Sequence, residues 1–99
     1  MANVSTKITA NTTITSDNSL FFGVIITADG TATPGTTIEV YNGTSSSGTH
    51  VSSLVIALPS STNIYRGLTI KCNAGLRIES GDWTGVTLFV LHAWGVING

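Results

Sequence analysis

Charged side chains are scarce in this 99-residue chain. They make up 9% of the positions, compared with about 25% in ordinary globular proteins, and the formal net charge is −1. The basic residues form no run and alternate with acidic ones; they are Lys7, Arg66, Lys71 and Arg77. Tracking a phosphate backbone requires a concentrated positive surface. We therefore expect no nucleic-acid partner.

Residues that carry catalytic or metal-binding chemistry are also few. The chain has one cysteine, Cys72, and two histidines, His50 and His92, that lie far apart in sequence. A zinc site requires three or four ligands at defined spacing, and these residues supply no such set. Asp29 and Asp82 lie in turn-like stretches, where their ordinary role is to bond the backbone. No nucleophile elbow or P-loop is present. We expect no enzymatic activity, no metal and no cofactor.

Long hydrophobic runs are missing as well. The first sixteen residues lack the apolar core of a signal peptide, and no window approaches the ~18 apolar residues of a membrane helix. A membrane partner is therefore not expected. Cys72 alternates with Leu68 and Ile70, which predicts a free thiol buried on the apolar face of a strand, and a single cysteine excludes an intrachain disulfide.

Serine and threonine fill much of the chain instead, at 27 of its 99 positions. With so little net charge, a free monomer has weak electrostatic repulsion against association. Two interpretations follow. Either a large part of the surface lies against protein, or the chain is a monomer solvated by its hydroxyl groups.

The apolar residues follow the spacing of β-strands, and no segment has a helical period. Residues 19–27 (SLFFGVIIT) are apolar on both faces of the pleat, which predicts a central strand, and residues 85–94 (GVTLFVLHAW) have the same character. Shorter alternating runs lie between them, separated by Gly, Pro, Asn and Ser turns. About seven or eight short strands predict an all-β fold, namely a compact antiparallel β-sandwich or jelly-roll-like domain.

The chain divides into two parts by composition. The strand pattern of residues 17–99 predicts a single β-sandwich domain. Residues 1–16 alternate only weakly, and their large aliphatic residues are Val4, Ile8 and Ile14. This segment is either an extended arm, which adds to the sheet edge of a neighbour, or an edge strand of the domain itself.

Several apolar residues are candidates for contact with another protein subunit. Besides the three aliphatic residues of the N-terminal segment, these are Phe21, Phe22, Phe89 and Trp94. Packing in the core is the alternative for each of them. Trp83 lies in the turn SGDWTG and is the candidate for an exposed ligand contact, because aromatic faces pack against sugars. A small carbohydrate-binding module is therefore an alternative function.

Three stretches together resemble a known family. TIEVYNGTSSSGT has a strand ending in Tyr41 before the Gly- and Ser-rich loop 42–49. NIYRGLTIKC has an aromatic-x-Gly-Leu step, and GLRIESGDWTGVTLFV leads into the closing strand from Val86. In this combination and order, over about residues 23–90, the chain resembles small virion proteins of tailed bacteriophages. It departs from them at its end, where LHAWGVING continues past the usual closing strand.

The resemblance implies a virion structural protein without catalytic residues. It implies a head decoration or cement protein that binds the outside of the head at junctions between major capsid subunits and stabilises the shell. The implied partners are the major capsid protein and further copies of the chain in a homotrimer. The protein would be made in the cytoplasm of the bacterial host and end on the outer surface of the virion head. A tail, neck or fibre-adaptor component is the alternative within the virion.

Overall fold

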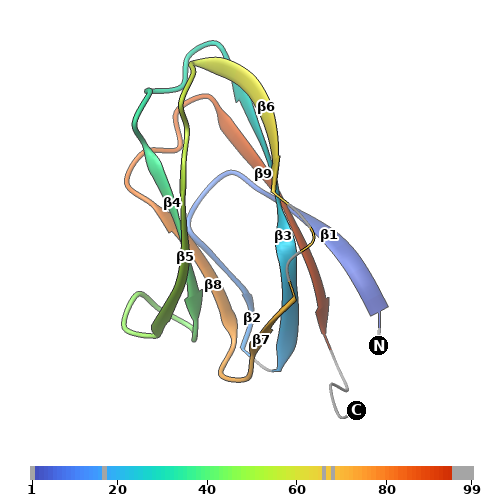
Figure 1. The fold of residues 1–99 in the computed structure, drawn as a ribbon. Helices are drawn as coiled ribbons and strands as arrows, with labels where there is room; N and C mark the ends of the chain where they lie inside the picture. Colours follow the sequence, from blue (N-terminus) through green and yellow to red (C-terminus); the bar gives the residue numbers. More distant parts are fainter. Residues whose placement is uncertain (1, 17, 66, 68, 95–99) are drawn as a thin grey trace.

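The computed structural model describes the backbone of residues 2–16, 18–65, 67 and 69–94, and the side chains of those residues except 2–4 and 94. This part of the chain folds into antiparallel β-strands without a helix (Figure 1). The strands are β1 (Ala2–Ile8), β2 (Thr12–Thr15), β3 (Ser19–Asp29), β4 (Thr37–Asn42), β5 (Thr49–Val55), β6 (Ser60–Tyr65), β7 (Ile70–Cys72), β8 (Leu76–Ser80) and β9 (Val86–Trp94). Accordingly, none of the described residues belongs to a helix that could cross a membrane.

The strands form two sheets, which confirms the predicted antiparallel sandwich. One sheet has the order β1-β9-β3-β6, with β7 also paired to β3, and the other has the order β2-β8-β4-β5. The chain folds as one long hairpin that is rolled up. Its first half pairs with its second half, β1 with β9, β2 with β8, β3 with β6 and β7, and β4 with β5. This is the strand order of a jelly roll.

The described residues form nine strands where the sequence predicts seven or eight. The difference arises at β6 and β7, which are two separate pieces along the same edge of β3. β6 pairs with residues 24–29 of β3, and β7 pairs with residues 19–21. Counted as one interrupted strand, they give the eight-stranded arrangement that a jelly roll has.

β3 lies at the centre of the larger sheet, as its sequence predicts. Its register runs along most of β9, from Ser19 opposite Trp94 to Ala28 opposite Val86, with a bulge between Phe21 and Gly23. A strand that is flanked on both sides has no open edge, and residues with high β-propensity favour this position.

The core lies between the two sheets and is formed by every second residue of their strands. Each fully buried large aliphatic or aromatic side chain contributes about 1.5–3 kcal/mol relative to an exposed one. Cys72 is fully buried, so the predicted buried thiol is confirmed, and burial raises its pKa. The fully buried apolar side chains of greatest volume are Phe21, Val24, Ile26, Ile38, Val40, Ile56, Leu76, Ile78, Leu88 and Val90.

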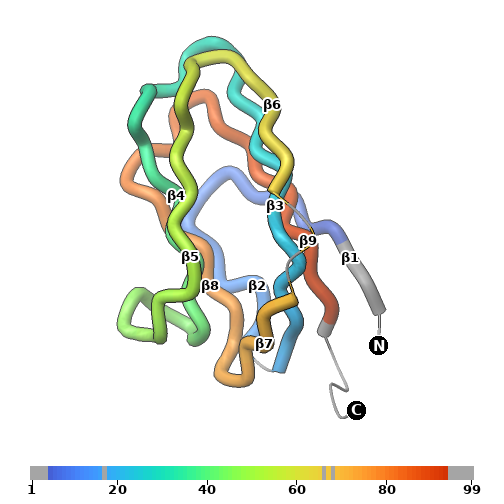
Figure 2. Tube along the Cα trace, viewed as in Figure 1, coloured from blue at the N-terminus to red at the C-terminus, as the bar shows by residue number. Residues whose placement is uncertain are grey.

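The N-terminal residues are part of both sheets. β1 pairs with β9 from Ala2 to Ile8 and forms one edge of the larger sheet, while β2 forms an edge of the smaller one. Ile8 belongs to the core with 5% of its surface exposed, and Ile14 packs against the core. Figure 2 shows the chain passing from β1 across to the opposite sheet before it returns as β3.

The Gly- and Ser-rich loop between β4 and β5 has a tightly packed base. The Gly43 amide donates to the Gly75 carbonyl, and the Gly48 amide donates to the Ser45 carbonyl. The loop therefore lies beside the turn between β7 and β8, at one end of the sandwich (Figure 2). Residues 44–47 at its tip are exposed.

We predict that Gly75→Ala destabilises the fold by about 1–3 kcal/mol. Gly75 has a φ of +127°, and a Cβ there would lie 2.8 Å from the Gly43 carbonyl oxygen and 2.9 Å from the Thr15 carbonyl oxygen. Gly81→Ala is the matched control, because a Cβ at Gly81 meets nothing within 4 Å. Urea unfolding should separate the two variants, and equal midpoints would contradict this account of the loop base.

His92 is a buried polar residue that ties β1 to β9. Its ring Nε2 lies 2.8 Å from the Thr6 hydroxyl, and 1% of the residue is exposed. Burial lowers the pKa of His92 from its ordinary value of 6.5, because the charged ring would lose its hydration. The imidazole is therefore neutral in the folded protein at neutral pH.

We predict that the melting temperature falls between pH 7 and pH 5. Below pH 6.5 the unfolded chain binds a proton at His92 that the folded chain does not, so stability is full above that pH and is lost as the pH drops. Each kcal/mol lost corresponds to about 4–8 °C. His92→Gln should flatten this dependence, while His50→Gln, at an exposed residue, should keep it. An unchanged pH dependence of the melting temperature in His92→Gln would contradict the attribution of this effect to His92.

Candidate functional site

The outer surface of the larger sheet carries a continuous set of apolar side chains. The ladder register places Ile25 of β3 beside Phe89 of β9 on one side and beside Ile64 of β6 on the other. These residues alternate with the buried Val24, Ile26, Leu88 and Val90, so their side chains point away from the core. The outward apolar face consists of Leu20, Phe22, Ile25, Ile64, Phe89 and Leu91.

These six side chains do not belong to the core. Ile64 is 56% exposed, and the other five are partly buried by their neighbours within the sheet. The partly buried hydrophobic residues that pack against the core are a different set, namely Ile14, Val51, Leu54, Tyr65, Ile70 and Trp83. An antiparallel sheet that faces water usually alternates apolar inside with polar outside. The larger sheet departs from this pattern on its two central strands.

Charged residues lie at the margins of the outward apolar face. Lys71 pairs with Leu20 at one end of β3, and Asp29 ends β3 at the other. Lys7 lies opposite Phe89 on the edge strand β1. Asp29 accepts hydrogen bonds from the hydroxyl and the amide of Thr31 at 2.6 and 2.9 Å, which lower the pKa of its carboxyl group and keep it ionised at neutral pH.

The outer surface of the smaller sheet is polar. The register places Glu39 of β4 directly opposite Glu79 of β8. Two like charges in this position repel each other. The Arg77 guanidinium donates to Glu79 at 3.0 Å, and the His50 ring Nε2 lies 3.0 Å from a Glu39 carboxylate oxygen, so each carboxylate has a hydrogen-bonding partner. A hydrogen bond from Ser53, with a smaller contribution from His50, lowers the pKa of Glu39.

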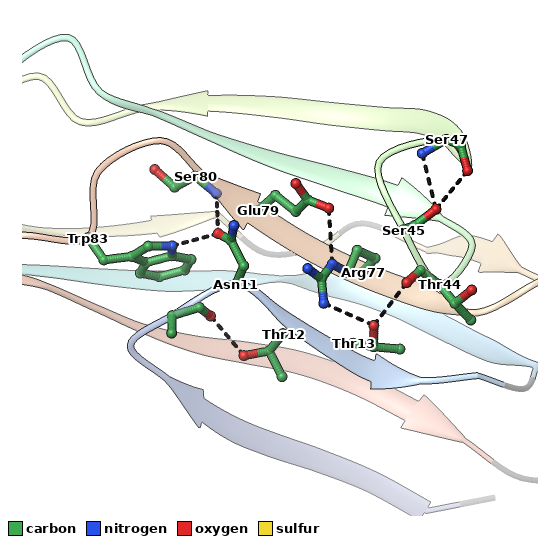
Figure 3. A network of polar contacts seen from close by, with 11 residues as sticks. Asn11, Thr12, Thr13, Thr44, Ser45, Ser47, Arg77, Glu79, Ser80 and Trp83 are labelled. Atoms are coloured by element: carbon green, nitrogen blue, oxygen red, sulfur yellow. Dashed lines mark hydrogen bonds and ion pairs between the residues drawn. The ribbon is translucent and has the colours of Figure 1, made fainter.

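Hydrogen bonds extend this polar surface to both ends of the smaller sheet (Figure 3). Arg77 donates to the Thr13 hydroxyl at 3.1 Å, and that hydroxyl donates to the Thr44 carbonyl in the β4–β5 loop. At the opposite end, the Asn11 side-chain oxygen accepts from the Ser80 amide and from the Trp83 indole N–H. The outer surface of the smaller sheet is thus mostly polar, although Tyr41 of β4 and Val55 of β5, which is 49% exposed, also lie on it.

The structure places the predicted interface residues in three different environments. Phe22 and Phe89 lie on the outward apolar face. Phe21 and Ile8 lie in the core, and Ile14 packs against the core. The side chains of Val4 and Trp94 lie outside the described residues, although their backbones pair between β1 and β9.

Trp83 is less exposed than its turn sequence predicts. It is partly buried and packs against the core, and its indole N–H donates to the Asn11 side-chain oxygen at 2.7 Å. Beside it, Asp82 accepts hydrogen bonds from the amide of Thr84 and the hydroxyl of Thr33, which lower the pKa of Asp82. Asn11 and Asp82 therefore act as turn-forming groups, and one edge of the Trp83 ring is already engaged within the chain.

The described residues contain no group of three or more His, Cys, Asp or Glu side chains that could hold a metal ion. No pocket was found over this part of the structure. The outward apolar face is the surface feature that remains as a candidate for function.

Sequence reasoning identified only part of this face. Residues 19–27 and 85–94 were predicted to be apolar on both faces, which implicitly includes Leu20, Ile25 and Leu91. Ile64 was missed, because a single isoleucine in the polar stretch STNIY gives no periodic signal. Only the pairing of β6 with β3 brings it beside Ile25.

Comparisons with protein-family models, with curated proteins and with solved structures give no match for this chain.

Proposed function

We propose that this chain is a structural protein of a bacteriophage virion, of the decoration or cement type. It binds the outside of the head at junctions between major capsid subunits. The observation that carries the proposal is the unequal polarity of the two outer surfaces, with a hydrogen-bonded polar surface on the smaller sheet and the outward apolar face on the larger one. Such a module acts by burying area against protein.

Three further features support this function. The jelly roll is a recurrent fold of viral capsid proteins, although it also occurs in lectins and cupins, so it supports the proposal only as an analogy. The low charge of the chain suits a protein whose surface is largely covered. The order of loop and strand motifs resembles that of small phage virion proteins.

A decoration protein stabilises the shell by mass action. Each copy binds the assembled shell and not its separated subunits, so the binding free energy adds to the stability of the assembled state. A ligand at 100 times its Kd contributes about 2.7 kcal/mol per site. Many sites on one shell therefore add up to a substantial resistance to heat and internal pressure.

We predict that the purified protein pellets saturably with phage heads that lack it and raises the temperature at which those heads open. Heads that already carry a full complement are the matched control, because their sites are occupied and should bind no more. Cosedimentation measures binding, and release of packaged DNA on heating measures stability.

Failure to pellet with heads would contradict the decoration function. Pelleting with isolated tails instead would place the protein among tail, neck or fibre-adaptor components. Retention by host polysaccharide, lost in Trp83→Ala, would support the carbohydrate-binding alternative.

A further inference from the structure

We propose that the free edge of β6, the edge that does not pair with β3, binds an extended segment of a partner protein. The bound segment adds to the larger sheet as a further strand. The partner is the capsid of the function proposed above, on which this inference rests for the identity of the partner alone. Three features of β6 support strand addition: its unpaired backbone groups, its lack of protection and its position beside the outward apolar face.

The backbone of β3 bonds its two neighbours in strict alternation. At one end of the strand, the Gly30 amide donates to the Pro59 carbonyl before β6, and the Asp29 amide donates to the Gly85 carbonyl before β9. Successive residues of an antiparallel strand direct their N–H and C=O groups to opposite sides. Even-numbered residues of β3 from Val24 to Ala28 therefore bond β6, and odd-numbered ones bond β9.

This alternation fixes which backbone groups of β6 are unpaired. The register places Ser61, Tyr65 and the residue midway between them opposite the β3 residues that bond on this side. The N–H and C=O groups of Ser60, Thr62 and Ile64 therefore point away from β3, and no other described strand pairs with β6. All three residues are exposed. Their donors and acceptors recur about every 6.6 Å, which is the repeat of an extended backbone.

The other edge strands carry features that oppose the addition of a strand. Natural sheets protect their edges with charged side chains, short strands and bulges. β1 contains Lys7, and β7 has three residues with Lys71 at its centre. β2 has four residues, and the registers of β2 and β5 are both interrupted by a bulge. β6 contains no charged residue and no proline, and its register with β3 is continuous. It is the unprotected edge among the described strands.

The free edge of β6 adjoins the outward apolar face. Ile64 is 56% exposed and lies beside Ile25, which lies beside Phe89. An added strand would lie about 4.8 Å further out and would place a side chain next to Ile64. Cross-strand neighbours of like character stabilise a sheet. The segment that fits is therefore uncharged and extended, with apolar side chains at alternate positions that continue the outward apolar face.

The first test uses a synthetic peptide and no phage heads. The peptide alternates valine with threonine and has lysines at both ends for solubility. In NMR spectra of the full-length protein, millimolar peptide should shift the amide signals of Ser60, Thr62 and Ile64 and leave those of β1 in place. Thr62→Pro should abolish these shifts. Unchanged β6 amides, or equal shifts on β1, would overturn the proposal.

The second test uses the same substitution with phage heads that lack the protein. Thr62→Pro removes an N–H that points away from β3, so the pairing of β6 with β3 is kept; proline is tolerated at such edge positions. Loss of one hydrogen bond to the partner should raise the Kd for heads by about ten-fold in cosedimentation.

Two matched controls separate this effect from a general loss of stability. By the same alternation, the Ser5 N–H on β1 points away from β9, so Ser5→Pro makes the same change at a different edge. Thr62→Val changes the same side chain and keeps the N–H. Both variants should bind heads as tightly as the unchanged protein, and circular dichroism confirms that each variant is folded.

The outcomes for β6 and for the proposed function are distinguishable. Tight binding of heads by Thr62→Pro would overturn the strand addition and leave the decoration function standing. A protein that ignores heads, while the peptide shifts its β6 amides, would contradict the decoration function alone. A dimer in light scattering that Thr62→Pro abolishes would identify a second copy as the occupant of the edge and overturn the assigned partner.

Discussion

The pairing of β3 with β9 is the interaction on which the rest of this structure depends. The two strands are the longest, lie side by side in the middle of the larger sheet, and are apolar on both faces of the pleat. Their inward residues, such as Val24 and Val90, form the centre of the core. Their outward residues, such as Ile25 and Phe89, then necessarily form an apolar surface, because successive side chains of a strand point to opposite faces.

The smaller sheet has the opposite arrangement, with charged side chains on its outer surface. Its outer surface holds Glu39 and Glu79 directly opposite each other; the Arg77 guanidinium bonds Glu79 and offsets their repulsion, and the His50 ring bonds Glu39. Four of the chain's few ionisable residues thus interact on a single surface. This explains how a chain with 9% charged residues can have one hydrated side while leaving the other side apolar.

The jelly-roll strand order places these two surfaces on different sheets of the sandwich. Because the chain is rolled as one hairpin, residues 2–8 and 12–15 become edges of opposite sheets, and short contacts such as that of Thr6 with His92 join sequence ends that are far apart. Residues 2–8 and 86–94 are therefore structural parts of the sandwich. Removing the first sixteen residues would remove one strand from each sheet, so the contribution of this segment to binding is better tested through side chains than by deletion.

The sequence by itself determined the all-β class, the central position of residues 19–27, the buried thiol of Cys72 and the apolar character of Phe22 and Phe89. These follow from a period of two residues, which is a local property of the chain. Only the tertiary structure decided which apolar residues face inward, since Phe21 and Phe22 are neighbours and the bulge at Gly23 sets the phase. It also decided that Ile64 joins Ile25, and that Trp83 is held by Asn11, 72 residues away. These outcomes depend on strand pairing between distant segments, which no local pattern encodes.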